Sequence, residues 1–181
     1  MTTYASLLYS RVPAVIRTVF DICRFEQPPQ ALPPSAVLLA ITLASYTLAR
    51  MVVGWFTMPA DVAALAGFID SALLILTIVI ALRVRHFSHR ILQTLTACSA
   101  VGSVVTLLHI AGFSVLVMAP VPLLHLGVGH ALAAPLIVWN LVLNARILRE
   151  ALSSGLTAGF SLALVYMVLV WWITASLVST V

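Results

Sequence analysis

The sequence predicts an all-α fold: a polytopic integral membrane bundle of five transmembrane helices, preceded by an N-terminal amphipathic interfacial helix. Of the 181 residues, 62% are hydrophobic and only 8% are charged, whereas soluble domains carry roughly a quarter charged residues. Five apolar stretches each exceed the roughly 20 residues that cross about 30 Å of hydrocarbon. So little polar surface cannot cover a water-soluble globule, and the chain is short for a second large domain.

Residues 1–34 are expected to form a cytoplasmic segment. In residues 5–24, apolar side chains gather on one side at helical spacing and charged ones on the other. Such a helix lies in the membrane interface or packs on the base of the bundle, and both alternatives stay open. Pro13 suits a first helical turn, so the regular helix is expected to begin near Val12. Residues 27–34 (QPPQALPP) predict a stiff, extended linker.

Residues 35–181 are expected to form one transmembrane domain. The predicted spans lie near Ser35–Phe56, Ala60–Val84, Ile91–Val117, Val121–Leu143 and Leu156–Val178. The connections between them are short, which makes neighbouring helices antiparallel and adjacent.

The arginines predict the orientation. All nine basic residues are arginine. The N-terminal segment holds Arg11, Arg17 and Arg24, the second connection Arg83, Arg85 and Arg90, and the fourth connection Arg146 and Arg149. The first and third connections and the C-terminal end hold none. The positive-inside rule therefore places the N-terminus in the cytoplasm and the C-terminus outside. Cys23 and Cys98 then face the reducing side, and no disulfide is expected.

Small residues recur at four-residue spacing and predict close helix packing. Such pairs let helices approach where lipid provides no hydrophobic drive for association. They serve either packing within the bundle or a partner helix. The candidates for this face are Ala40, Ala44, Ala63, Gly67, Gly127, Gly129, Ala131 and Ala133.

Two charges inside predicted spans are candidates for function, because charge in the bilayer is costly. Arg50 lies about 9 Å, and Asp70 roughly 13 Å, from the outer ends of neighbouring helices at 1.5 Å per residue. The two side chains are therefore able to form an ion pair. The pair either holds the hairpin together or makes Asp70 a proton acceptor or cation ligand.

Three histidines extend this predicted polar cluster: His109, His125 and His130. His125 and His130 point about 140° apart on a helix, which argues against a shared metal ion. Hydrogen bonding inside the bundle and a proton relay are the alternatives. No metal or cofactor is expected.

Catalysis and nucleic acid binding find no support in the sequence. We find no nucleophile motif, phosphate loop or paired carboxylates in one segment. A membrane enzyme that acts on lipid lacks a nucleophile–base arrangement. A basic face on a folded polar domain, which nucleic acid binding needs, is also missing. The basic loop around His86 and His89 is expected to contact lipid headgroups or, alternatively, a cytoplasmic partner.

Two segments show a local pattern found in known membrane proteins. In residues 85–108 (RHFSHRILQTLTACSAVGSVVTLL) a basic loop leads into a Gln- and Thr-rich helix start. In residues 137–166 a Trp-containing span leads through Leu-Arg-Glu-Ala-Leu into the last span. These segments resemble the Ypt-interacting-protein (Yip) family of five-span membrane proteins and its bacterial relatives. The resemblance covers about residues 35–178 and implies the fold more than an activity, because the long cytoplasmic domain of eukaryotic members is missing.

The expected function is that of a non-enzymatic membrane protein, an adaptor or assembly subunit that acts through helix–helix contacts. Its expected partners are membrane lipids and a membrane protein or further copies of itself. The lysine-free, Ala- and Arg-rich composition indicates a bacterial inner membrane. The alternative is a small transporter or channel subunit that uses the Arg/Asp/His cluster.

Overall fold

All described elements of the chain are helical. The computed structural model describes residues 14–118 and 125–179, with side chains for residues 14–112, 114 and 134–179. A short N-terminal helix covers residues 14–23. The later elements are η1 (Pro29–Ala31), α2 (Ala36–Trp55), α3 (Ala60–Val84), η2 (Ser88–Arg90), α4 (Ile91–Met118), α5 (His125–Ala151) and α6 (Leu156–Ser179).

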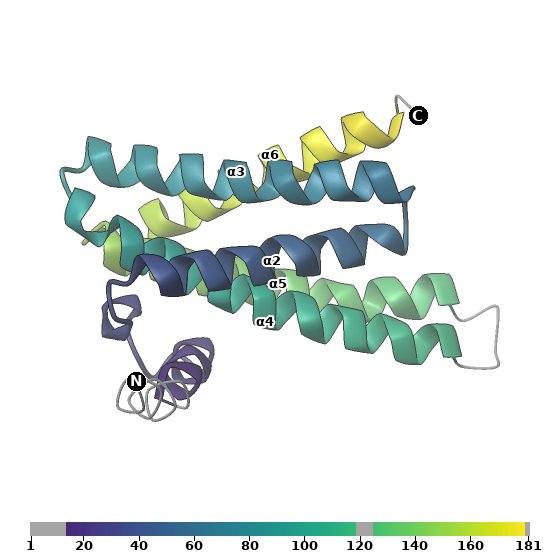
Figure 1. Cartoon of the computed structure of the whole chain (residues 1–181), viewed down its shortest axis with the longest axis horizontal. Coiled ribbons are helices and arrows are strands. Elements are labelled where there is room, and N and C mark those ends of the chain that lie inside the picture. The colour runs from purple at the N-terminus through teal and green to yellow at the C-terminus, as the bar shows by residue number, and fades with distance from the viewer. Residues whose placement is uncertain (1–13, 119–124, 180–181) are drawn as a thin grey trace, which may run out of the picture.

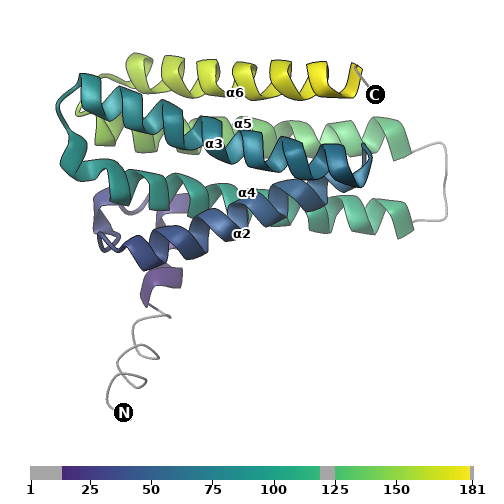
Figure 2. The same ribbon diagram turned by 45° about the horizontal axis from the view of Figure 1, so that its top comes forward.

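The five long helices lie alongside one another, and successive helices run in opposite directions (Figures 1 and 2). Their contacts close a ring in which α2 packs on α4, α4 on α5, α5 on α6, α6 on α3, and α3 on α2. The N-terminal helix lies at the end of the bundle that carries the α3–α4 and α5–α6 connections, and α6 ends at the opposite end.

The most buried helix is α4, where the residues from Thr94 to Ser103 are all buried. Several of these carry hydroxyl groups, which donate to the backbone carbonyl four residues earlier. Thr96 donates to Leu92 at 2.7 Å, and Ser99 donates to Leu95 at 2.8 Å. These bonds satisfy polar side chains inside an apolar bundle.

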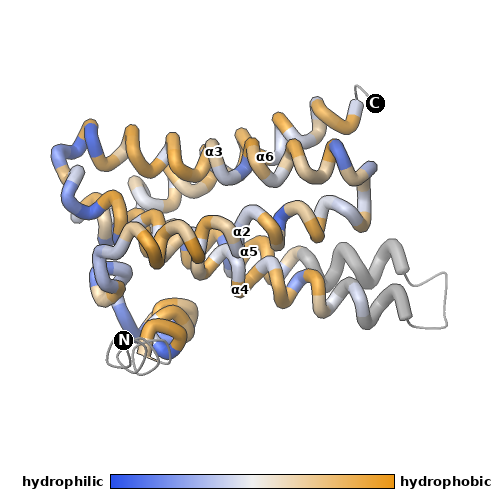
Figure 3. The backbone as a smooth tube through the Cα atoms, in the orientation of Figure 1, coloured by the Kyte–Doolittle hydropathy of each residue, from blue (hydrophilic) through white to orange (hydrophobic). Residues whose placement is uncertain are grey.

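Four helices are long and apolar enough to cross a membrane: Ala36–Trp55, Ala60–Val84, Ser88–Gly112 and Leu156–Ser179. Hydrophobic residues cover most of these helices, and hydrophilic residues gather at the end with the α3–α4 connection (Figure 3). Over its described residues α5 does not join this set. It carries Asn140, Asn144, Arg146, Arg149 and Glu150. A fifth span therefore stays a prediction.

The helix bounds follow the predicted spans closely, except in α5. This helix continues to Ala151, eight residues past the predicted end at Leu143. An ion pair between Arg146 and Glu150, 3.2 Å apart and one turn from each other, supports the extra turns. The Arg90 guanidinium also caps the helix by donating to the carbonyls of Glu150 (3.2 Å) and Ala151 (3.1 Å). The predicted span ended at Leu143 because polar residues follow it. Polar residues do not prevent the helix itself from continuing.

The N-terminal helix packs on the base of the bundle. Val19, Ile22 and Cys23 are buried in the common hydrophobic core, whereas Ile16 and Phe20 on the other side are about half exposed. This packing is one of the two alternatives for that helix. Contact of the exposed Ile16 and Phe20 side chains with the membrane interface stays a prediction.

The proline-rich linker is bound to the bundle rather than free. The Gln93 side-chain amide donates to the carbonyls of Gln30 (3.3 Å) and Leu32 (3.0 Å). Gln30 in turn donates to the carbonyl of Glu150 at 3.3 Å. A cavity of about 10 Å³, lined in part by Gln27 and Glu150, lies beside these contacts. It offers room for about one water molecule.

Candidate functional site

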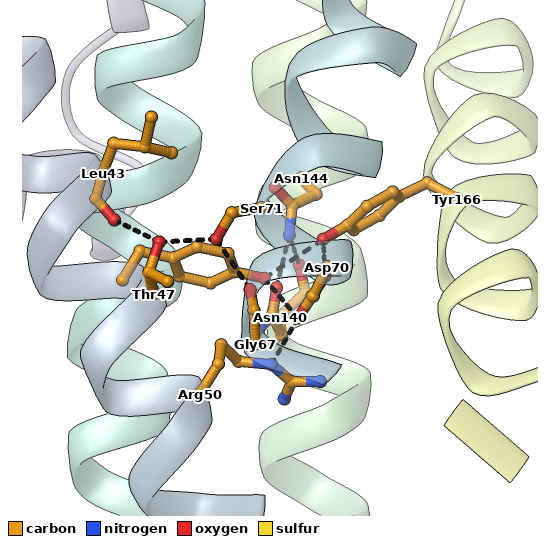
Figure 4. Close-up of polar contacts among 10 residues, drawn as sticks. Leu43, Thr47, Arg50, Gly67, Asp70, Ser71, Asn140, Asn144 and Tyr166 are labelled. Carbon is orange, nitrogen blue, oxygen red and sulfur yellow. Dashed lines mark hydrogen bonds and ion pairs between the residues drawn. The ribbon is translucent and has the colours of Figure 1, made fainter. Parts of the chain in front are cut away.

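A buried carboxylate lies at the centre of the bundle. Asp70 on α3 is only 2% exposed. Its Oδ2 accepts hydrogen bonds from the Arg50 Nε and, at 3.0 Å, from the Tyr46 hydroxyl. Its Oδ1 accepts a hydrogen bond from the Tyr166 hydroxyl. These four residues, Tyr46, Arg50, Asp70 and Tyr166, are called the Asp70 cluster below; Arg50, Asp70 and Tyr166 are labelled in Figure 4.

The α2–α3 hairpin brings the first three residues of this cluster together. Tyr46 and Arg50 lie four residues apart on α2 and so share one face of that helix. The short connection between the helices sets their register, which places Asp70 beside this face. The predicted meeting of Arg50 and Asp70 is therefore present in the structure as an ion pair.

Two glycines make room for the cluster. A Cβ at Gly67 would lie 2.7 Å from the Met51 side chain and 3.2 Å from the Thr47 carbonyl. A Cβ at Gly102 on α4 would lie 2.7 Å from the Tyr46 ring. The close approach of α3 and α4 to α2 therefore depends on the missing side chains at these positions.

Tyr166 brings in a third helix, α6. Its hydroxyl oxygen also lies 3.1 Å from the Tyr46 hydroxyl oxygen. Each hydroxyl has one hydrogen, so a tyrosine that donates to the other tyrosine gives up its hydrogen bond to Asp70. The carboxylate thus joins α2, α3 and α6 through charged and polar contacts.

Further polar side chains lie around the cluster (Figure 4). The hydroxyls of Thr47 and Ser71 are 2.6 Å apart and bridge α2 and α3 next to Asp70. On α5, the Asn144 side chain donates to the Asn140 carbonyl at 3.0 Å. Sequence reasoning missed both tyrosines and both asparagines. Local signals point to three of them: Tyr46 places a hydroxyl one turn from Arg50, and Asn140 and Asn144 lie four residues apart at the end of a predicted span. Tyr166 has no such local signal.

The electrostatics of the cluster are balanced. One guanidinium faces one carboxylate, and two neutral phenols donate to the carboxylate oxygens. Because removing charges from water costs several kcal/mol per ion, pairing together with additional hydrogen bonds is what makes such burial tolerable. The Arg50 side chain is 34% exposed, so the guanidinium keeps partial contact with the surroundings of the bundle.

The predicted histidines are placed only in part. His109 on α4 is partly buried. Within the described side chains, no hydrogen bond joins it to the Asp70 cluster. His125 and His130 fall in α5, but their side chains lie outside the described residues.

The predicted packing face divides into three groups. Ala63 and Gly67 are buried between α2 and α3, where a Cβ at Gly54 would lie 3.0 Å from the Ala63 Cβ. Ala40 and Ala44 on α2 are exposed. The side-chain positions of Gly127, Gly129, Ala131 and Ala133 lie outside the described residues.

Comparison with known proteins provides no relative. No family model, no curated protein and no solved structure matches the chain.

Proposed function

We propose that this protein is a membrane-embedded adaptor or assembly subunit that binds another membrane protein through α2. The observation that carries the proposal is the exposure of Ala40 and Ala44, four residues apart, on the outer face of this helix. Small residues at this spacing let a second helix approach closely in lipid. The comparable pair Ala63 and Gly67 is already buried by contacts within the chain.

The Asp70 cluster supports a structural role for the opposite face of α2. Its charges are paired and its carboxylate oxygens are hydrogen-bonded, so the cluster holds α2, α3 and α6 in fixed register. A rigid helix with one free face of small residues is suited to docking a partner helix.

The number of spans, the orientation and the type of membrane are part of the proposal. Five spans, a cytoplasmic N-terminus and a bacterial inner membrane follow from the arginine pattern and the composition. Membership of the Yip family rests on the two sequence segments alone. The N-terminal helix lies at the end of the bundle that carries the arginine-rich α3–α4 and α5–α6 connections, which supports this orientation.

In-membrane crosslinking with Ala44→Leu tests the proposal. Leucine at this exposed position should block a partner helix without disturbing the bundle. The matched control is Ala72→Leu, at a small residue that is also exposed, on α3. We expect mass spectrometry to show a cross-linked membrane partner with wild type and with Ala72→Leu, and its loss with Ala44→Leu. Retention of every partner by a folded Ala44→Leu variant would contradict the proposal.

Transport is the second candidate. It is favoured by the contact between the Tyr46 and Tyr166 hydroxyls beside Asp70, since hydroxyls in contact with a carboxylate are able to pass a proton. In that case Asp70→Asn and the milder Tyr166→Phe should abolish a proton or cation flux in liposomes. The control is Asp61→Asn, an exposed carboxylate in the first turn of α3. Wild-type flux in the folded variants would remove this candidate.

A further inference from the structure

A groove opens between the end of α5 and the start of α6, away from the Asp70 cluster. Its volume is about 890 Å³, and Phe25 after the N-terminal helix closes one side. The lining residues are Phe25, Val142, Ala145, Arg146, Arg149, Glu150, Leu156, Thr157 and Phe160.

The charged groups of the groove lie near the end of the bundle. The Arg146 Nε pairs with Glu150 Oε1 at 3.2 Å, and its guanidinium stacks 5.2 Å above the Phe25 ring. Arg149 is exposed, and among the described residues no hydrogen bond or ion pair engages its side chain. The groove therefore carries one excess positive charge, and Arg149 is the guanidinium free to bind an anion.

The other end of the groove is apolar. Val142 lies about two turns before Arg149 on α5, and Phe160 lies one turn after Leu156 on α6. All three apolar side chains are substantially exposed. The groove thus changes from charged to apolar over about 10 Å along the helix axes. This change matches a phospholipid, in which a charged headgroup is followed by apolar acyl chains.

The groove is held in shape by close backbone contact. A Cβ at Gly159 would lie 2.4 Å from the Ala145 carbonyl oxygen and 2.8 Å from the Arg149 amide nitrogen. The start of α6 therefore lies directly against α5 at the level of Arg149. Little reorganisation is needed for a ligand to enter, and a preformed site lowers the cost of binding.

We propose that this groove binds one phospholipid with a singly charged anionic headgroup, such as phosphatidylglycerol. The phosphate contacts the Arg149 guanidinium, with the Thr157 hydroxyl beside it, and the acyl chains lie on Val142 and Phe160. The Glu150 carboxylate disfavours headgroups with a second negative charge. A phosphodiester matches the planar donors of arginine, which favour bidentate contacts.

The test is native mass spectrometry of the full chain in detergent, titrated with phosphatidylglycerol or phosphatidylcholine of the same acyl chains. We expect wild type to retain one phosphatidylglycerol more tightly than phosphatidylcholine. Arg149→Gln should weaken phosphatidylglycerol binding about five- to tenfold and leave phosphatidylcholine binding unchanged. Arg85→Gln, an exposed arginine at the same end of the bundle but outside the groove, should bind like wild type.

A second pair of variants tests the apolar end. Phe160→Ser should weaken the binding of both lipids, whereas Leu164→Ser, one turn further along α6 and outside the groove, should not. Glycerophosphoglycerol, the headgroup without acyl chains, should not compete at the same concentration. Equal loss in Arg149→Gln and Arg85→Gln would indicate a general basic surface and overturn the proposal. Competition by the free headgroup, or a protein dimer that lipid does not displace, would overturn it as well.

Discussion

At the scale of single residues, Asp70 determines how the bundle closes. A carboxylate with 2% exposure in an apolar helix is unstable without partners. Arg50, Tyr46 and Tyr166 provide those partners from two other helices. Each helix that contributes a donor is thereby fixed relative to α3.

We expect Asp70→Asn to destabilise the protein by about 3 kcal/mol, because the substitution leaves the Arg50 guanidinium without its counter-charge. Reversible unfolding in mixed micelles measures this change. Asp61→Asn, at an exposed carboxylate on the same helix, should change the stability by less than about 1 kcal/mol. The double variant Arg50→Gln/Asp70→Asn should recover part of the loss. An Asp70→Asn variant as stable as wild type would show that the ion pair does not hold the bundle.

At the scale of elements, glycines set the distances between helices. Gly67 brings α3 against α2, Gly102 accommodates the Tyr46 ring, and Gly159 brings α6 against the α5 backbone. By contrast, a Cβ at Gly112 on α4 would meet no atom of the described chain within 4 Å.

We expect Gly159→Ala to destabilise the protein by about 1–3 kcal/mol, because backbone atoms of α5 cannot move aside as a flexible side chain can. Gly112→Ala is the matched control. It should be neutral or stabilising by roughly 0.5–1 kcal/mol, since alanine favours the helix interior. Thermal denaturation in detergent compares the two variants. Equal stability of both would show that the α5–α6 contact adjusts freely.

The packing of the N-terminal helix makes Cys23 a reporter. Burial raises the pKa of the Cys23 thiol from 9.0 to about 11. The reactive form is the thiolate, so alkylation at pH 7.5 should be slow and should accelerate as the pH rises toward 11. In a Cys98→Ala background, Ile22→Ser should detach the helix, return the pKa toward 9 and accelerate alkylation about a hundredfold.

Ile16→Ser serves as the control for this experiment, because Ile16 lies on the exposed side of the same helix. It should leave the alkylation rate unchanged. Equally fast alkylation of Cys23 in the parent protein and in Ile22→Ser would contradict the docked position of the helix.

At the scale of the whole molecule, the positions of the two ends of the chain depend on how many helices span the membrane. The N-terminal helix and the end of α6 lie at opposite ends of the bundle (Figure 2). Four of the five long helices are apolar enough to span a membrane. Under the proposal that α5 is a fifth span, the number of crossings is odd.

We therefore expect reporter fusions to place the two termini on opposite sides of the membrane. A fluorescent protein fused to the N-terminus should fold in the cytoplasm, and alkaline phosphatase fused to the C-terminus should be active outside. The arginine asymmetry is the physical cause. Replacing Arg83, Arg85, Arg146 and Arg149 with glutamine should reduce this bias, and two reporters on one side would contradict five spans.

The sequence by itself determined the features that depend on local pattern. Long apolar stretches placed α2, α3, α4 and α6 to within a few residues, because the thickness of the bilayer sets helix length. The short α2–α3 connection also made the meeting of Arg50 and Asp70 predictable, since a tight hairpin fixes the register of its two helices.

Only the tertiary structure decided which helix faces which. Tyr166 meets Asp70 across 96 positions of the chain, and the end of α5 became helix through contacts with Arg90. The physical reason is that lipid is as apolar as the interior of the bundle, so buried and exposed faces of these helices carry the same hydrophobic residues. The order in which the helices pack around the ring is determined instead by a few polar contacts and by glycines that allow close helix contact. These contacts join distant segments, so no local pattern reveals them.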